Sequence, residues 1–100
     1  MKKSQNQVSL VGRISGEPVE RELPSGDRVV TFRIVVPRDE GGVDTIDCAA
    51  WSAALRRKAL SMVDSEAQIT GQLRRRFWQS PKGLASRYEV KAETLVRVRI

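Results

Sequence analysis

A chain of 100 residues is long enough for one domain with a modest hydrophobic core, and residues 1–100 are expected to form that domain. Its 18 lysines and arginines outnumber its 12 aspartates and glutamates. The net charge of +6 favours a polyanionic partner, because each neutralised phosphate releases condensed counterions. The chain has no histidine and one cysteine, Cys48, which excludes His-dependent catalytic triads, histidine metal sites and an intrachain disulfide.

The same composition bears on location and chemistry. A single cysteine fits a reducing cytoplasm, and no apolar run is long enough for a signal peptide or a membrane span. We therefore expect a cytoplasmic protein. No metal or other cofactor is expected, and an enzyme is the least favoured class of function.

Alternating apolar and polar residues predict three strands in the first half of the chain. The expected ranges are 8–14, 29–36 and 45–51. Arg13 and Arg33 lie on the polar faces of the first and second strands, whereas Phe32 belongs to the apolar face of the second. Gly16-Glu17-Pro18 interrupts the first strand, and Pro24-Ser25-Gly26-Asp27 predicts a tight hairpin turn before the second.

The second half of the chain is predicted to contain a helix and two strands. Ser52 is a suitable N-cap for a helix over residues 53–62. The remaining elements are a strand over 67–79, a hairpin turn over 80–83, a strand over 86–92 and a last extended piece over 95–100. Three strands, a helix and two strands is the order of an OB-fold, a partly open five-stranded Greek-key barrel. The expected class is therefore all-β, with residues 1–5 disordered.

Candidate binding residues are concentrated in the segment Gly71-Gln72-Leu73-Arg74-Arg75-Arg76-Phe77-Trp78. Strand alternation places Arg74, Arg76 and Trp78 on one face of this segment. Arginine supplies charge for phosphates and tryptophan supplies a flat surface for an unstacked base, so the combination suits single-stranded nucleic acid. Trp51 has the outward parity of the third strand and is the second candidate for stacking, with a plug at the end of the barrel as its alternative role.

Further basic residues complete the predicted nucleic-acid site. Arg33 points to the outer sheet face near the same surface, although a merely solvated arginine is the alternative. Arg13, on the outer face of the first strand, and Lys82, in the hairpin turn, are also assigned to the site.

Other chemistry-bearing residues are assigned elsewhere. Three aromatic side chains are expected in the core: Phe32, Phe77 and Tyr88. The helix run Arg56-Arg57-Lys58 is expected to face solvent. Asp44 and Asp47 have no third carboxylate nearby, so a structural role is favoured over a metal-dependent nuclease pair. Asp47 either pairs with an arginine on the binding face or marks a stretch that nucleic acid avoids.

Several motifs resemble, in order and spacing, those of bacterial single-stranded DNA-binding proteins. They are Asn6-x-Val8-x-Leu10-Val11-Gly12-Arg13-Ile14, Pro18-x-Glu20-Arg21-x-x-Pro24-Ser25-Gly26, Cys48-Ala49-Ala50-Trp51, Gly71-Gln72-Leu73-Arg74-x-Arg76-x-Trp78 and Arg87-Tyr88-Glu89-Val90. The resemblance covers roughly residues 5–95. It implies an OB-fold that assembles, usually as a homotetramer, and wraps single-stranded DNA without sequence preference. It also implies that Trp51 and Trp78 stack on bases and that Arg74 and Arg76 lie on the basic strand.

The sequence departs from that family's pattern in two places. Thr45 stands where many members have an aromatic residue, and the loop 38–42 lacks one too, which implies weaker stacking or a smaller footprint. The sequence stops at Ile100 without the Gly/Pro-rich tail and acidic tip of replicative members. A truncated or tailless member is therefore expected, and recruitment of replication proteins is not expected without that tail.

The residues predict binding of single-stranded nucleic acid, and the resemblance implies a nucleoid-associated protein that binds single-stranded DNA in replication, repair or recombination. One alternative is a primosome-type paralogue of the same fold, a dimer that acts mainly through protein contacts. Another is an RNA-binding OB module. The mass in solution distinguishes a tetramer from a dimer, and competition between matched DNA and RNA oligonucleotides distinguishes the two nucleic acids.

Overall fold

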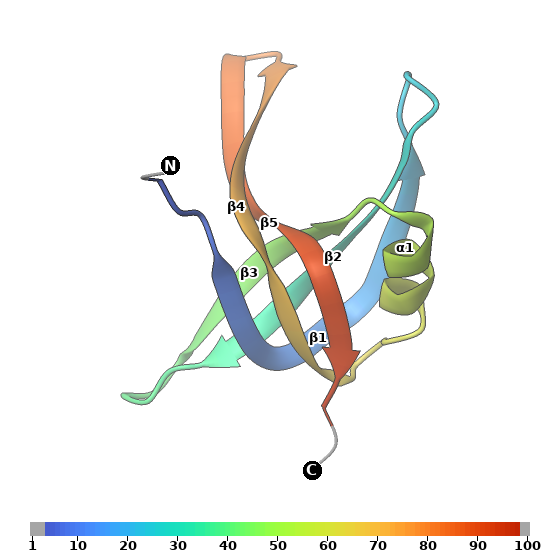
Figure 1. The fold of residues 1–100 in the computed structure, drawn as a ribbon. Helices are drawn as coiled ribbons and strands as arrows, with labels where there is room; N and C mark the ends of the chain where they lie inside the picture. Colours follow the sequence, from blue (N-terminus) through green and yellow to red (C-terminus); the bar gives the residue numbers. More distant parts are fainter. Residues whose placement is uncertain (1–3, 99–100) are drawn as a thin grey trace.

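The computed structural model describes residues 4–98 and shows a five-stranded β-barrel with one helix (Figure 1). Its elements are β1 (Val8–Glu22), β2 (Arg28–Pro37), β3 (Val43–Ala50), α1 (Ala53–Leu60), β4 (Glu66–Ser80) and β5 (Gly83–Arg97). The barrel closes in the order β1-β2-β3-β5-β4; β3 and β5 pair parallel, and the other neighbours pair antiparallel. The predicted all-β OB-fold is confirmed, as is the helix between the third and fourth strands. Of residues 1–5, which are expected to be disordered, residues 1–3 lie outside the described part of the chain.

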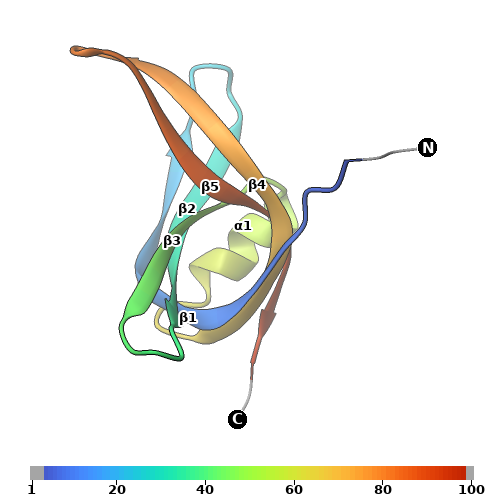
Figure 2. The same cartoon turned by 90° about the vertical axis from the view of Figure 1, so that its left-hand side faces the viewer.

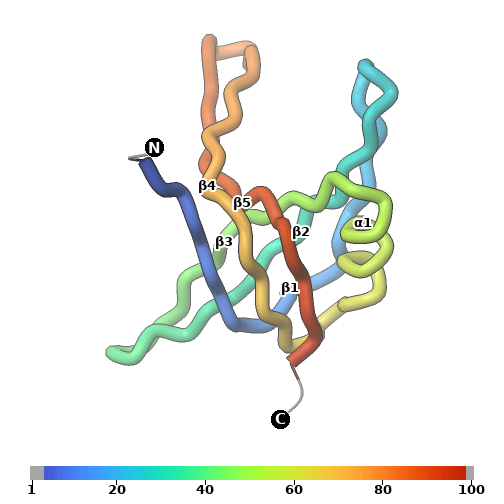
Figure 3. Tube along the Cα trace, viewed as in Figure 1, coloured from blue at the N-terminus to red at the C-terminus, as the bar shows by residue number. Residues whose placement is uncertain are grey.

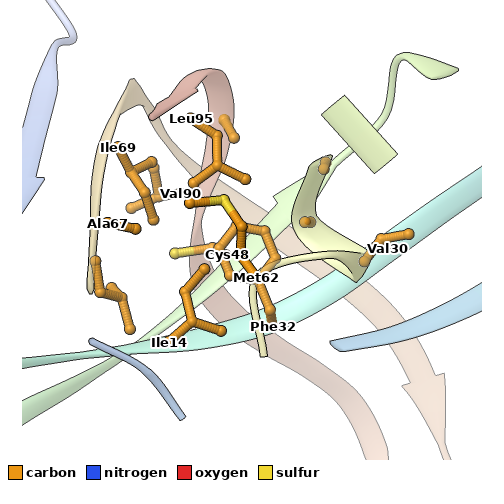
Figure 4. Close-up of a cluster of buried hydrophobic side chains, with 13 residues drawn as sticks. Ile14, Val30, Phe32, Cys48, Met62, Ala67, Ile69, Val90 and Leu95 are labelled. Carbon is orange, nitrogen blue, oxygen red and sulfur yellow. The ribbon is translucent and has the colours of Figure 1, made fainter. Parts of the chain in front are cut away.

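The barrel is filled by the inward residues of all five strands and by Met62, which follows the helix (Figure 4). The buried side chains are Ile14, Val30, Phe32, Ile34, Cys48, Ala50, Ala59, Met62, Ala67, Ile69, Val90, Ala92 and Leu95. Burying one large apolar side chain of this kind stabilises the fold by about 1.5–3 kcal/mol. The prediction that Ile14, Phe32 and Cys48 face inward is therefore confirmed, whereas Ala49, on the opposite face of β3, is buried as well. Burial raises the pKa of the Cys48 thiol to about 12, so this thiol is neutral and unreactive at physiological pH.

Two strands are longer than predicted because they bend instead of ending. β1 continues through residues 16–18 to Glu22, and its pairing with β2 shifts register between Ser15 and Val19. Gly16 takes a φ of 73° in this bend, a conformation that glycine adopts without steric cost. β5 is likewise one strand from Gly83 to Arg97, with a register shift against β4 between Thr70 and Gly71. The expected breaks in these strands were wrong, since a bulge accommodates the extra residues. Residues 99–100 of the predicted last piece lie outside the described residues.

Two hairpins project from the same end of the barrel as arms (Figures 1 and 3). One arm is the β1–β2 hairpin, which turns at Gly26, and the other is the β4–β5 hairpin, which turns at residues 81–82. Figure 2 shows the β4–β5 arm leaning away from the body of the barrel. The arms carry their strands beyond the core, so side chains on them meet solvent on both faces of the ribbon.

This geometry corrects the expected burial of two aromatic residues. Phe77 and Tyr88 were expected in the core, but they are 54% and 58% exposed. Tyr88 has the same strand parity as buried Val90 on β5, and Phe77 has the parity of Leu73 on β4. Alternation correctly indicates which face each residue occupies, yet both residues lie on the arm, where there is no core for that face to contact.

The helix start is held to the β1–β2 arm by Arg56. The Ser52 side chain accepts a hydrogen bond from the Leu55 amide at 3.2 Å, which confirms the predicted N-cap. Arg56 donates to the backbone carbonyl of Trp51, and its Nε lies 3.5 Å from a Glu20 carboxylate oxygen. The expectation that Arg56 faces solvent was therefore wrong, because these contacts leave its side chain only partly exposed. Nothing helical between residues 4 and 98 has the length and hydropathy of a membrane span.

Candidate nucleic-acid interface

The outer face of the bent sheet has a groove of about 420 Å³. The bend of β1 forms one side, residues 31–33 of β2 and 47–48 of β3 form the floor, and the base of the β4–β5 arm forms the other side. Its lining residues are Ser15, Gly16, Glu17, Val19, Arg21, Thr31, Phe32, Arg33, Asp47, Cys48, Arg76, Arg87 and Glu89. Four of these are arginines, contributed by four different strands (β1, β2, β4 and β5) and therefore brought together only by folding.

Two carboxylates organise three of the groove arginines. Asp47 lies between two of them: Arg33 Nε is 3.2 Å from its Oδ1, and Arg87 Nε is 3.7 Å from its Oδ2. Arg76 Nε lies 3.5 Å from Oε1 of Glu89, whose residue surface is only 6% exposed. Of the two roles considered for Asp47, the pairing with arginines is the one that the structure shows.

All three of these arginines have their Nε as the nearest nitrogen to the carboxylate. Among the hydrogen bonds of residues 4–98, none uses a terminal Nη of Arg33, Arg76 or Arg87. The two Nη groups are the part of a guanidinium fork that a phosphate contacts. The groove therefore holds its arginines from one side and leaves their phosphate-binding ends available.

Arg38 provides the contrast, because its fork is already occupied. Its Nε and Nη2 both donate to Asp44 Oδ1, at 3.0 and 2.6 Å. This hydrogen bonding lowers the pKa of the Asp44 carboxyl and raises that of Arg38. Asp44 and Asp47 thus serve different arginines, and no group of three or more potential metal-binding side chains gathers anywhere in residues 4–98.

A second hollow of about 420 Å³ continues from the groove towards the tip of the β4–β5 arm. Its lining consists of Arg21, Arg76, Arg87 and Trp78. The guanidinium carbons of Arg76 and Arg87 lie 5.6 and 5.9 Å from the centre of the Trp78 ring. These are cation–π distances, so the two arginines hold the indole in place at the mouth of the groove.

The predicted site residues fall into two groups. Arg33, Arg76 and Trp78 lie together in the two hollows. The other four lie outside them. Arg74 shares the strand face of Arg76 but donates to Gln72, Arg13 lies 4.0 Å from Asp64, Lys82 is at the tip of the arm, and Trp51 is half-buried at the end of β3.

Two of the four groove arginines were not among the predicted site residues: Arg21 and Arg87. Arg87 pairs directly across the hairpin from Arg76, so counting outward from the predicted 80–83 turn could have found it. Arg21 reaches the groove only because β1 bends at Gly16-Glu17-Pro18, a segment that the sequence predicts to interrupt the strand.

A barrel of OB-fold topology with an arginine-lined groove and a tryptophan at its mouth belongs to the class of nucleic-acid-binding OB-fold proteins. Comparison of the sequence with known proteins identifies the family within that class. The profile of the single-strand binding protein family matches residues 5–98, and this chain belongs to that family. It is 33% identical over 89 residues to single-stranded DNA-binding protein A of Bacillus subtilis (strain 168), in a match that covers 78% of this chain and 49% of that protein. The chain thus spans about half the length of this curated relative.

Proposed function

We propose that this protein binds single-stranded DNA without sequence preference, along the groove and over Trp78. The observation that carries the proposal is the set of Arg33, Arg76 and Arg87 with free Nη ends beside an exposed indole. Family membership and the named activity of the Bacillus relative support the same conclusion.

The proposed mechanism uses two kinds of contact. The Nη groups bind backbone phosphates, which every sequence presents alike, and Trp78 stacks on the face of an unpaired base. A duplex keeps its bases stacked inside, so it offers no free face to Trp78. Selectivity for single strands therefore comes from the tryptophan, while most of the salt dependence comes from the arginines.

A fluorescence titration tests the function. Single-stranded oligonucleotides are expected to quench tryptophan emission and duplexes of the same length to leave it largely unchanged. Raising the salt concentration should weaken binding, with a slope of log K against log [salt] of about −0.7 for each phosphate contacted. Equal quenching by duplex, or no binding of single strands at low salt, would contradict the proposal.

Asp47 gives a second prediction, because its charge opposes phosphates that enter the groove. Asp47→Asn is expected to tighten single-strand binding about threefold at low salt. A carboxylate about 7 Å from a phosphate costs roughly 0.6 kcal/mol at the dielectric constant of water. The asparagine oxygen can still accept from Arg33, so the arginine keeps its place. Asp44→Asn is the matched control: it makes the same charge change outside the groove and should alter affinity less. Weaker binding by Asp47→Asn would show that the carboxylate charge itself is needed.

The outer face of β1, β4 and β5 supports a proposed homo-oligomer, with a tetramer favoured over a dimer. Six neighbouring outward residues form an uncharged patch there: Ser9, Val11, Gln68, Thr70, Thr94 and Val96. The charged residues Arg13, Glu66 and Lys91 border this patch. Such an uncharged patch suits packing against a second copy. A nucleoid-associated role in replication, repair or recombination is part of the same proposal, since those processes expose single strands.

A further inference from the structure

The β4–β5 arm carries a second aromatic surface on the side facing away from Trp78. We call it the back face and define it by Leu73, Arg75, Phe77, Leu84 and Tyr88. Hairpin pairing sets these residues on one side of the ribbon, where Arg75 lies opposite Tyr88, and Arg76 and Trp78 on the other. Leu84 is 71% exposed, and Phe77 and Tyr88 are more than half exposed. The proposed groove site uses none of these side chains.

A guanidinium lies among the aromatic rings of the back face. The central carbon of Arg75 is 4.9 Å from the centre of the Phe77 ring and 5.3 Å from that of Tyr88. Its Nε and Nη2 both donate to the Ser86 hydroxyl, at 3.2 and 3.0 Å. Within residues 4–98, no carboxylate forms a salt bridge with Arg75. The back face therefore combines two accessible rings with a positive charge that no carboxylate neutralises.

That chemistry fits nucleic acid better than a second copy of the chain. A tightly packed contact between copies excludes water, and an arginine without a counter-ion is costly there. The uncharged patch on β1, β4 and β5 is the better surface for such a contact. Single-stranded nucleic acid brings both partners that the back face lacks: phosphates for Arg75 and base faces for Phe77 and Tyr88.

The back face also continues the proposed path of the strand. Arg75 and Phe77 alternate along β4 with Arg76 and Trp78, so the two faces are the two sides of a single two-stranded ribbon. We propose that the back face is a second stacking site for the same single-stranded DNA, an inference that rests on the function proposed above. A strand that leaves the groove at Trp78 passes around the arm and places further bases on Phe77 and Tyr88.

Oligonucleotide length separates the two sites. Affinities are measured for oligothymidylates from about 4 to 16 nucleotides, the range that one OB-fold covers, and for longer ones. The double variant Phe77→Ala/Tyr88→Ala is expected to bind the shortest ligands like the wild type. As the oligonucleotide lengthens, the affinity of the double variant should rise by a factor at least about fivefold smaller than that of the wild type. Tyr88→Phe, which keeps the ring, should retain that gain. Both positions are exposed, so the barrel is expected to stay folded, and circular dichroism verifies this.

Other outcomes overturn the inference, and they differ from a failure of the function itself. If the double variant keeps the full gain with length, the back face does not bind DNA. If it keeps the gain and its mass in solution falls, the back face is a contact between copies. If the wild type binds no single strand at any length, the proposed function and this inference fail together.

Discussion

Replacing Trp78 with alanine is expected to weaken single-stranded DNA binding by about 1–3 kcal/mol, or roughly 5- to 150-fold. The indole is the aromatic side chain that lines the hollow beyond the groove. Its removal takes away one stacked base and also the surface over which Arg76 and Arg87 lie. Affinity measured by anisotropy of a labelled oligonucleotide reports the loss without depending on tryptophan emission.

Matched variants sharpen this prediction. Trp78→Phe keeps a smaller ring and should retain much of the affinity. Trp51→Ala removes a tryptophan outside both hollows, and its effect tests the sequence-based assignment of that residue to the site. If Trp78→Ala remains folded and binds like the wild type, the role proposed for the indole is wrong.

Gly71→Ala is expected to lower the free energy of unfolding by about 1–3 kcal/mol or more, the typical cost of overpacking. A Cβ atom at Gly71 would lie 2.1 Å from the carbonyl oxygen of Lys91 on the paired strand. That oxygen belongs to the backbone, so relief requires β4 and β5 to separate. The position is next to the register shift at Thr70 and Gly71, where the β4–β5 arm leaves the barrel.

Urea denaturation followed by circular dichroism measures this effect. Lys58→Ala, on the exposed side of α1, is the control and should change the free energy of unfolding by less than about 0.5 kcal/mol. A Gly71→Ala protein with wild-type stability would mean that the two strands tolerate a wider separation than this packing indicates.

Sequence patterns predicted the barrel well because one face of each strand must be buried. Ile14, Phe32 and Cys48 lie on the inward faces that alternation assigns them. Alternation has no information about where the barrel ends, so it could not show that Phe77 and Tyr88 lie beyond the core.

The groove was only partly predictable, because it is assembled from residues distant in sequence. Arg76 and Trp78 could be identified from the pattern of the 71–78 segment, and both line the hollow next to the groove. Arg21 and Arg87 join them through a bend and a hairpin register, which depend on tertiary structure. The pairing of Glu89 with Arg76 was equally hidden, since a glutamate on a strand usually faces solvent.

The bend in β1 and the projecting β4–β5 arm have a consequence for how the protein can evolve. The sides of the groove belong to the bent part of β1 and to the β4–β5 arm, whereas the folding energy comes largely from apolar side chains inside the barrel. The residues that determine the affinity for a ligand are therefore mostly different from those that determine thermal stability. The width and charge of the groove can change by substitutions at the arms while the interior stays intact.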